Sequence, residues 1–388
     1  MGKTSKSHTD TFTQSLLRAG DDIAARQKAI SREAARRASR KLPRLSAING
    51  FRFPTLLSAE QCTSELLAAF HATLIEEGSR VADLTAGLGV DIFAISSRAS
   101  EITAVEIDPI VADALAHNSI TLGHDNITII QADSMPWIEN KTDAYDVIFI
   151  DPYRRDSNGG RVFTLSDCQP DVTDNLPRLL NAAPTVIIKA SPMLDTSLAV
   201  RQMNRHAHRV ILLGTDTECK ELIIICHRAI TEQPSFSAIT CHSDGTHTSF
   251  DWEAHEENAA TATMGTPEPG YFLYEPWPAT MKGGAFKLMS QRFGLKKIAD
   301  STHLYISAQR CGNFPGSSYE IIEVSDFKKS VIRTLRNKYP VINVASRNFP
   351  LKAAGLEKRL GTRPGGELRL HGTTLHDGRK VMIVSRKI

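Results

Sequence analysis

The sequence has no apolar run of 18 or more residues, and no apolar core follows its first lysines. A membrane-spanning helix needs about 20 apolar residues in a row and a secretory signal needs an apolar core, so we expect neither. The six cysteines and 13 histidines are scattered, without a C-x-x-C pair or a zinc-like spacing. We therefore expect no metal site and a reducing, cytoplasmic setting.

A large overall charge is also missing, because the net charge is only +3, but the charges are unevenly distributed. Residues 1–50 hold 11 Lys/Arg against 4 Asp/Glu, and residues 327–388 hold 15 against 3. The stretch between them, 51–326, holds 20 against 36. Basic ends suit a polyanion, because neutralising its phosphates releases counterions. They would equally suit two solvated helical faces, so charge alone leaves both interpretations open.

Helical spacing of apolar residues is present at the start of the chain. Residues 14–48 are rich in Ala, Arg and Gln, and they predict helices that end near Pro43. A further helix is expected with Ser58 as its N-cap, since Gln61 three residues later gives a capping-box spacing. We therefore expect an N-terminal helical domain over residues 1–76.

Short β-branched runs alternate with helical segments over residues 77–230. The runs are RVADL, ITAVEI, ITII, DVIFI, TVIIK, RVILL and LIIIC. Seven strands with helical crossovers indicate an α/β domain with a mostly parallel sheet covered on both faces. The last two runs are too close for a helical crossover and should pair as an antiparallel hairpin.

The remainder of the chain divides at a polar segment. Residues 231–268 are Thr-rich and punctuated by prolines, which indicates a loosely structured arm. The C-terminal residues 317–388 predict a compact α+β unit in the order strand, helix, strand, helix, strand, strand. The HDG sequence before the last strand is typical of a hairpin turn.

The stretch VADLTAGLGVDIFA carries a ligand-binding pattern. Gly87 and Gly89 lie between a strand and a helix, where backbone amides can approach a ligand. Glu106, about twenty residues later, has the spacing of a carboxylate that holds ribose hydroxyls. Both nicotinamide dinucleotides and S-adenosylmethionine fit this pattern. The dinucleotide fingerprint lacks its third small residue, at Ile92, and Asp83 suits an ammonium group, so S-adenosylmethionine is favoured.

The ends of the third and fourth strands extend this pattern. The order D-x-x-x-G-x-G, E-x-D, A-D-S and D-P-Y resembles class I S-adenosylmethionine-dependent methyltransferases over residues 79–228. The resemblance implies that the cofactor is bound by residues from three strand ends: Asp83, Thr85, Gly87, Gly89, Glu106, Ile107, Asp133 and Ser134. Asp133 and Ser134 would meet the adenine.

Further segments resemble a bacterial methyltransferase family with a THUMP-like C-terminal domain. They include LLSAEQCTSE, IKASPMLD, YEPWPATMKGGAFKLMSQRFGLKKI and GTTLHDGRKVMIVSR. This resemblance implies a Rossmann-like seven-stranded sheet, a small ferredoxin-like connecting domain over 269–316, a basic THUMP-like domain over 317–388, and an RNA substrate such as tRNA or rRNA. It also implies that Gln61 and Thr63 reach over the cofactor, although both would equally suit a plain helix N-terminus.

Asp151, Pro152 and Tyr153 follow the fourth strand, whose carboxyl end should overlook the reactive methyl group. Amino-methylating enzymes of this fold use an Asp/Asn-Pro-Pro-aromatic turn here to hold the amine and stack on the base. With one proline instead of two, Tyr153 is shifted, so Asp151 is the main candidate catalytic residue. Arg154 and Arg155 would contact RNA, or form a surface pair.

Lys189 ends the fifth strand and is expected to neutralise Asp151 or an incoming phosphate. Carbon methylation through a cysteine is disfavoured, since Cys168 lies in an expected loop well after the motif. The sequence thus predicts an S-adenosylmethionine-dependent RNA methyltransferase acting on a base nitrogen. The alternatives are a methyltransferase of small molecules or proteins, and a non-catalytic RNA-binding protein.

Overall fold

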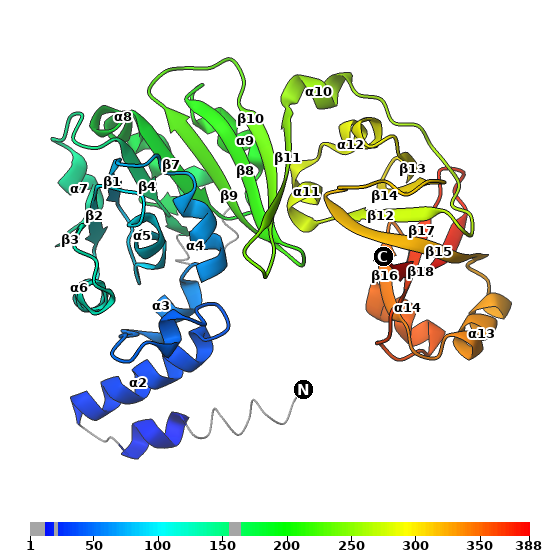
Figure 1. The fold of residues 1–388 in the computed structure, drawn as a ribbon, viewed down its shortest axis with the longest axis horizontal. Helices are drawn as coiled ribbons and strands as arrows, with labels where there is room; N and C mark the ends of the chain where they lie inside the picture. Colours follow the sequence, from blue (N-terminus) through cyan, green and yellow to red (C-terminus); the bar gives the residue numbers. More distant parts are fainter. Residues whose placement is uncertain (1–11, 19–21, 155–163) are drawn as a thin grey trace. The chain divides into compact units, whose positions relative to one another are not determined.

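The computed structural model describes residues 12–18, 22–154 and 164–388, drawn as a ribbon in Figure 1. The chain divides into two compact units. The first unit contains residues up to 210 together with 221–233 and 243–245, and the second contains 211–220, 234–242 and 246–388. Among the helices of the described ranges, none has the length and apolar character needed to cross a membrane.

Helices form the N-terminal part of the first unit, as expected. Helix α2 (Ile23–Ala38) begins after Asp22, whose carboxylate accepts the N–H of Ala25, and it ends before Pro43. A short 3-10 helix, η1 (Leu45–Ala47), follows. Glu33 on α2 is hydrogen-bonded to both Arg36 and Arg37, so part of the basic charge of this helix is neutralised within it.

The start of helix α3 (Leu56–Gln61) differs from the prediction. Thr55, not Ser58, is the N-cap: its backbone is extended and its hydroxyl accepts the N–H of Ser58. Ser58 completes the capping box from inside the helix, and Gln61 is the last helical residue. Both Thr55 and Ser58 have side chains that can cap a helix. Thr55 takes the role because its backbone is extended and the residues after it, Ser58 included, are already helical. Helix α4 (Glu65–Ala72) follows.

A largely parallel sheet forms the rest of the first unit, with neighbouring strands in the order β9-β7-β4-β1-β2-β3. Its strands are β1 (Arg80–Asp83), β2 (Glu101–Glu106), β3 (Ile127–Gln131), β4 (Val147–Ile150), β7 (Thr185–Ala190) and β9 (Cys219–His227). All neighbours are parallel except β7 and β9. Every residue of β4 is buried, as the apolar run predicted.

The hairpin expected from the last two apolar runs is present. Strand β8 (Ala207–Thr215) is followed by β9 and neighbours it in the sheet. The N–H of Thr215 donates to the carbonyl of Glu218 at 2.8 Å, and at the other end the N–H of His227 donates to that of His206 at 2.9 Å. The seven predicted strands are therefore confirmed.

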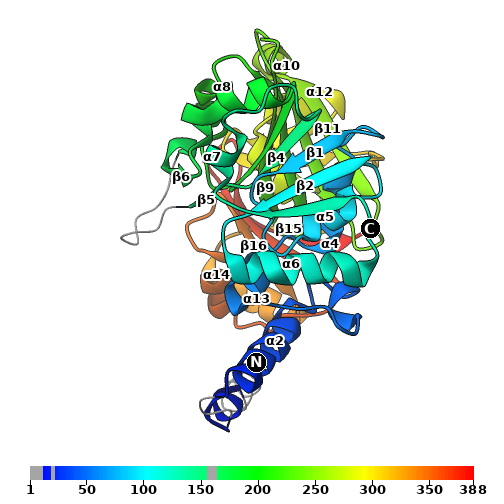
Figure 2. The ribbon, with the colours of Figure 1, turned by 90° about the vertical axis from the view of Figure 1, so that its left-hand side faces the viewer.

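Helices connect these strands in the doubly wound manner. They are α5 (Val90–Ile95), α6 (Pro109–Leu122), α7 (Ser134–Ile138), α8 (Val172–Ala182) and α9 (Thr196–Gln202). Figure 2 shows α7 and α8 on one side of β1, β2 and β4, and α4, α5 and α6 on the other. The Rossmann-like fold class is thus confirmed.

Residues 231–268 are not the loosely structured arm that the sequence suggested. Strands β10 (Ser235–Cys241) and β11 (His247–Glu253) form an antiparallel hairpin, followed by α10 (Ala254–Ala259). The many Thr and Ser residues concealed an alternation in which Phe250 and Trp252 are buried, with 4% and 6% exposure. Period-two burial of this kind is the mark of a half-buried strand.

A second sheet in the second unit has the strand order β13-β14-β12-β15-β18-β17-β16. Its strands are β12 (Phe272–Pro276), β13 (Lys296–Ala299), β14 (Thr302–Ser307), β15 (Gly316–Asp326), β16 (Asn343–Arg347), β17 (Leu368–Thr374) and β18 (Lys380–Lys387). Helices α11 (Pro278–Gly283), α12 (Phe286–Arg292), α13 (Lys329–Lys338) and α14 (Ala353–Leu360) complete it. The predicted order of C-terminal elements and the final hairpin are confirmed.

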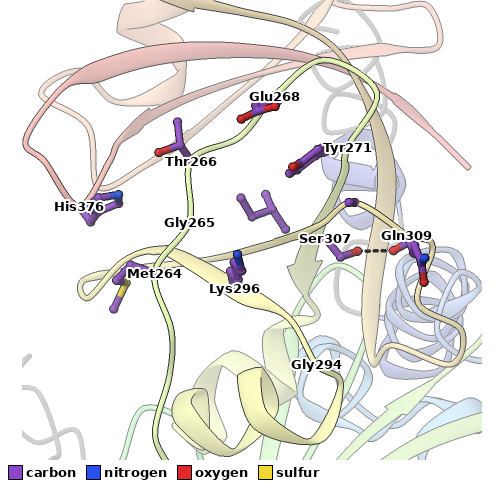
Figure 3. A pocket seen from close by; sticks show the side chains of 12 residues that line it. Met264, Gly265, Thr266, Glu268, Tyr271, Gly294, Lys296, Ser307, Gln309 and His376 are labelled. Atoms are coloured by element: carbon purple, nitrogen blue, oxygen red, sulfur yellow. Dashed lines mark hydrogen bonds between the residues drawn. The ribbon is translucent and has the colours of Figure 1, made fainter.

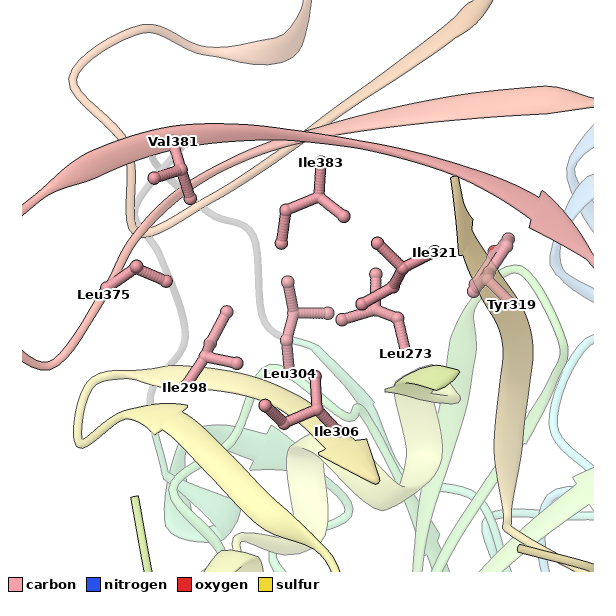
Figure 4. Close-up of a cluster of buried hydrophobic side chains, with 9 residues drawn as sticks. All are labelled: Leu273, Ile298, Leu304, Ile306, Tyr319, Ile321, Leu375, Val381 and Ile383. Carbon is pink, nitrogen blue, oxygen red and sulfur yellow. The ribbon is translucent and has the colours of Figure 1, made fainter. Parts of the chain in front are cut away.

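This second sheet is continuous across the expected boundary near residue 316. Strand β12 pairs with β15, and β15 pairs with β18. Figure 4 shows one shared core on this sheet, to which both sides of residue 316 contribute: Leu273, Ile298, Leu304, Ile306, Tyr319, Ile321, Leu375, Val381 and Ile383. The connecting segment and the C-terminal α+β segment therefore fold on a common framework.

Candidate functional site

The glycine-rich turn between β1 and α5 starts from a buried carboxyl group. Asp83, the last residue of β1, is 2% exposed, and its Oδ1 accepts the N–H of Thr85 at 2.9 Å. Burial raises the pKa of Asp83 to about 7, against the opposing effect of that hydrogen bond. A cation placed beside this carboxyl would favour its charged form.

The two glycines of the turn have different physical roles. Gly89 has φ +88°, and an added Cβ would lie 2.3 Å from Leu115 Cδ1 and 2.8 Å from Phe93 Cζ. The side chains of Leu115 and Phe93 therefore leave no room for a side chain at Gly89. Gly87 has φ +53°, and an added Cβ would meet only the carbonyl of Thr85, at 3.9 Å. The turn is thus open at Gly87, which is where a ligand could approach the backbone.

Glu106 at the end of β2 is tied to the glycine turn. Its Oε2 accepts the N–H of Gly87 and its Oε1 accepts the N–H of Asp108, both at 2.8 Å. Each carboxylate oxygen has a second lone pair, so the group can still accept hydroxyl donors. The next residue, Ile107, leaves 60% of its surface exposed and offers an apolar face beside the carboxylate.

The acid predicted to meet adenine begins a helix. Asp133 is the N-cap of α7, and its Oδ1 accepts the N–H of Met135 at 3.1 Å. Ser134, the first residue of α7, is 8% exposed. Both residues follow β3, which neighbours β2, so they lie at the same edge of the sheet as Glu106. Their role toward adenine stays a prediction.

These features fit S-adenosylmethionine. The open backbone at Gly87 can face the ligand, and the carboxylate of Glu106 is already oriented at the turn. The buried carboxyl of Asp83 suits the cofactor's ammonium group, because a positive neighbour offsets the cost of its ionisation.

Asp151 follows β4, which lies between β1 and β7. Its backbone N–H donates to the hydroxyl of Thr85 at 2.7 Å, so the glycine turn and the D-P-Y segment are joined directly. The side chain of Asp151 is 43% exposed, whereas Pro152 is buried. The sequence therefore placed the candidate catalytic acid correctly at the carboxyl end of the strand next to the glycine strand.

Tyr153 begins a short strand, β5 (Tyr153–Arg154), and is 56% exposed. Strand β5 pairs with β6 (Cys168–Gln169), with Arg154 opposite Cys168. Cys168 is thus not in a loop as expected: it is buried, with 4% exposure, in a strand beside the motif. Only the backbone of Arg154 is described, and Arg155 lies outside the described residues.

Lys189, at the end of β7, meets Asp151 as expected. Its buried ammonium contacts Asp151 Oδ2 at 2.8 Å and donates to Asp91 Oδ2 at 3.0 Å and Thr63 Oγ1 at 2.6 Å. An ammonium has three N–H donors, so these contacts use all of them. Thr63, which the sequence placed near the cofactor, therefore takes part in this cluster, whereas Gln61 is exposed at the end of α3.

Two further side chains, His71 and Glu221, extend the cluster inward. Asp91 on α5 accepts the Nδ1–H of His71 at 2.8 Å, and the other ring nitrogen of His71 lies 2.7 Å from Glu221 Oε2. Burial opposes the charge of His71, but Glu221 and Asp91 raise its pKa to about 9. His71 is therefore an imidazolium at neutral pH. Burial acts likewise against the charge of Asp91, and Lys189 and His71 hold the pKa of Asp91 well below its usual range.

Sequence reasoning missed His71, Asp91 and Glu221. Asp91 could have been found, because it directly follows the glycine turn on a helix that is otherwise apolar. His71 and Glu221 lie 150 positions apart, so no spacing rule connects them. A lone histidine in an apolar helix carries no signal of its partner.

The second unit contains a pocket of its own, with a volume of about 620 Å³ (Figure 3). Lys296, His376 and Glu268 supply polar groups to its wall, and Tyr271 and Met264 supply apolar ones. The hydroxyl of Ser307 donates to the carbonyl of Gln309 at its margin. None of the site residues predicted from the sequence lines this pocket.

Three family models match the chain. One, described as conserved hypothetical protein 95, matches residues 38–164; a ferredoxin-like domain matches 272–315; and a THUMP domain-like model matches 316–387. A solved structure from Porphyromonas gingivalis W83, designated a candidate methyltransferase, is 31% identical with a TM-score of 0.85. The match covers 94% of this chain and 90% of that one.

Two curated relatives each match about a third of this chain. Ribosomal RNA small subunit methyltransferase J of Chromobacterium violaceum is 28% identical over 138 residues, which are 31% of this chain and 54% of that protein. An uncharacterised S-adenosylmethionine-dependent methyltransferase of Mycobacterium tuberculosis is 31% identical over 136 residues, or 35% of this chain and 36% of that protein. The chain thus spans between about a third and about half of the length of these relatives.

Proposed function

Because this chain belongs to the methyltransferase family with a THUMP-like C-terminal domain, we propose that it transfers a methyl group from S-adenosylmethionine to a base nitrogen in RNA. The observation that carries the proposal is the contact between Thr85 and Asp151, 2.7 Å long. It joins the glycine turn to a partly exposed carboxylate at the carboxyl end of β4. Cofactor and acceptor would therefore meet at one edge of the sheet.

When bound, the cofactor supplies an electrophilic methyl group on a positively charged sulfur. Asp83 would then hold the cofactor's ammonium, Glu106 its ribose hydroxyls, and Ile107 one face of its adenine. Asp151 would accept a hydrogen bond from the amino group to be methylated and so direct the nitrogen lone pair. Methyl transfer requires an in-line approach, so this positioning supplies most of the effect.

Two further roles at the acceptor end follow from exposure and charge. Tyr153, 56% exposed beside Asp151, would stack on the acceptor base, a contact worth about 1–3 kcal/mol. Asp151 also provides an acceptor for the proton that the methylated nitrogen must release, because it carries the exposed carboxylate next to the turn. Asp151 is therefore the residue whose loss should affect turnover most.

The proposed substrate is RNA because residues 327–388 carry 15 Lys/Arg against 3 Asp/Glu. On α13, Lys329 and Arg333 are exposed and can meet phosphates. The name of one curated relative, a ribosomal RNA methyltransferase, supports the same substrate class. RNA and S-adenosylmethionine are both available in the cytoplasm, which is where we propose that the protein acts.

The substrate is tested by supplying labelled S-adenosylmethionine to the purified protein with total RNA from a strain lacking its gene. We expect one labelled nucleoside by mass spectrometry, which also identifies the methylated atom. Calorimetric binding of the cofactor without any labelled RNA would favour a small-molecule or protein acceptor. Absence of cofactor binding would favour a non-catalytic RNA-binding protein.

RNA binding by α13 has its own test. Changing Lys329 and Arg333 to Gln should lower the slope of log affinity against log salt by about 1.5–2, since each lost phosphate contact removes about 0.7–0.9. Arg201→Gln, an exposed arginine on α9, is the matched control and should leave the slope unchanged. An unaltered slope in the double variant would exclude this face of α13 from the RNA contact.

A further inference from the structure

Within the described part of the chain, one group holds the carboxylate of Asp151. Its Oδ2 lies 2.8 Å from Lys189 Nζ, and the two side chains are very unequally exposed, 43% for Asp151 and 8% for Lys189. The pair therefore has a buried cationic end and an open anionic end. Because the ammonium engages Oδ2, Oδ1 is the carboxylate oxygen that is left to accept a hydrogen bond from a substrate.

Lys189 cannot turn away from Asp151 without losing its other partners. Asp91 Oδ2 and Thr63 Oγ1 receive the other two N–H groups, and Thr63 Oγ1 itself donates to Asp91 at 2.7 Å. Asp91 is in turn fixed by the fully buried His71. The ammonium is thus anchored by α5 and by the segment that precedes α4, and its remaining contact is to Asp151, directly after β4.

Among the residues that the structure describes, the charges around Asp151 come from five elements. Asp83 on β1, Asp91 on α5 and Glu221 on β9 are acidic, whereas Lys189 on β7 and His71 on α4 are cationic. Burial opposes the charge of Lys189, but its acidic neighbours raise its pKa well above the ordinary value. Lys189 therefore stays charged at neutral pH and cannot serve as the base of the reaction.

We propose that Lys189 is a positioning residue that, anchored by Asp91 and Thr63, fixes Asp151 Oδ2 and thereby turns Oδ1 toward the acceptor nitrogen. The identity of that acceptor rests on the proposed function, whereas the pairing itself rests on the distances. Without the ammonium, the Asp151 carboxylate can rotate, and of the two cationic groups only His71 is left to oppose its acidic neighbours. Protonation would then persist to higher pH, and a protonated oxygen does not accept the amine N–H.

The proposal predicts a specific kinetic pattern for Lys189→Met. With the RNA substrate, kcat should fall about 100-fold while the cofactor Kd and the RNA KM stay within about threefold, the pattern of a group that acts in the transition state. The acidic limb of the pH–rate profile should move upward by about one unit or more. Lys189→Arg should have a kcat at least about tenfold higher than that of Lys189→Met, because arginine restores the positive charge.

Lys297→Met provides the matched control. Lys297 is also a buried lysine, 4% exposed, but it lies in the second unit and donates to the carbonyl of Asp300. This variant should keep the wild-type kcat and pH profile. If Lys189→Met does not fold, Thr63→Val removes one anchor of Lys189 and no charge, and should lower kcat by about tenfold without moving the acidic limb.

A titration without RNA separates this proposal from the proposed function. Carboxyl ¹³C NMR of labelled aspartates, with Asp151→Asn used for assignment, should show the Asp151 titration moving to higher pH in Lys189→Met. An unmoved Asp151 titration, or wild-type kcat in Lys189→Met, would overturn the positioning role. Failure of wild-type protein to methylate RNA, with the shift still present, would refute only the proposed substrate.

Discussion

Replacing His71 with glutamine should remove a pH-dependent part of the stability of the first unit. His71 is fully buried between Asp91 and Glu221, at 2.8 and 2.7 Å. Although burial opposes its charge, the two carboxylates raise its pKa from the ordinary 6.5 to about 9. A raised pKa means that the bound proton stabilises the folded state fully below pH 6.5, and that this stability is lost as the pH rises through 9.

The magnitude follows from the size of that shift. One pKa unit corresponds to about 1.4 kcal/mol, so the proton on His71 contributes about 3 kcal/mol when fully bound. Between about pH 7 and pH 9, the wild-type protein should lose about 2 kcal/mol of this contribution. Glutamine fills much of the space but takes up no proton. The difference in unfolding free energy between wild type and His71→Gln should therefore shrink by about 2 kcal/mol over that interval.

Hydrogen–deuterium exchange of peptides from α4 and β9 in increasing urea would follow the first unit separately from the second. His376→Gln, at an exposed histidine of the second unit, serves as the control and should leave these peptides unchanged. An equal free-energy difference between wild type and His71→Gln at both pH values would refute the reasoning. It would mean that His71 is neutral, and that one of its carboxylate neighbours carries the proton instead.

Three further predictions concern the turn and the acceptor end. Asp151→Ala should abolish turnover while the cofactor Kd, measured by calorimetry, changes by no more than about threefold; full activity would remove Asp151 from the site. Glu106→Ala should weaken cofactor binding about tenfold or more, because ribose hydroxyls lose an acceptor, and an unchanged Kd would contradict that assignment. Gly89→Ala should lower the unfolding free energy by about 1–3 kcal/mol, since its Cβ would lie 2.3 Å from Leu115 Cδ1. A neutral Gly89→Ala would show that α5 and α6 can separate freely.

The sequence predicted those parts of the site that depend on strand order. Apolar β-branched runs identify the strands, and parallel strands bring their carboxyl ends to one edge, so Asp151 and Lys189 could be expected to meet. The glycine turn was found for the same reason. Its two glycines nevertheless differ in role, because only three-dimensional packing shows that Leu115 and Phe93 occupy the space beside Gly89.

Other features depend on contacts that spacing does not encode. The hydrogen bond from His71 to Glu221 joins α4, which precedes the first strand of the sheet, to β9, which lies 150 residues later in the sequence. The β10–β11 hairpin was missed because Thr and Ser on its strands were interpreted as loop residues, although they fit a half-buried strand well. The start of α3 was misplaced because Thr55 and Ser58 are equally suitable caps by composition.

The continuous sheet of the second unit also bears on how such chains can be recombined. A cut after residue 315 would follow the edge between two family models, yet it would strip β12 of its neighbour β15. A bare strand edge invites association with other chains. For protein engineering, the unit to exchange is therefore the whole seven-stranded sheet of the second unit. Chimeras whose junction lies within this sheet should aggregate, whereas chimeras whose junction lies outside it should stay dispersed.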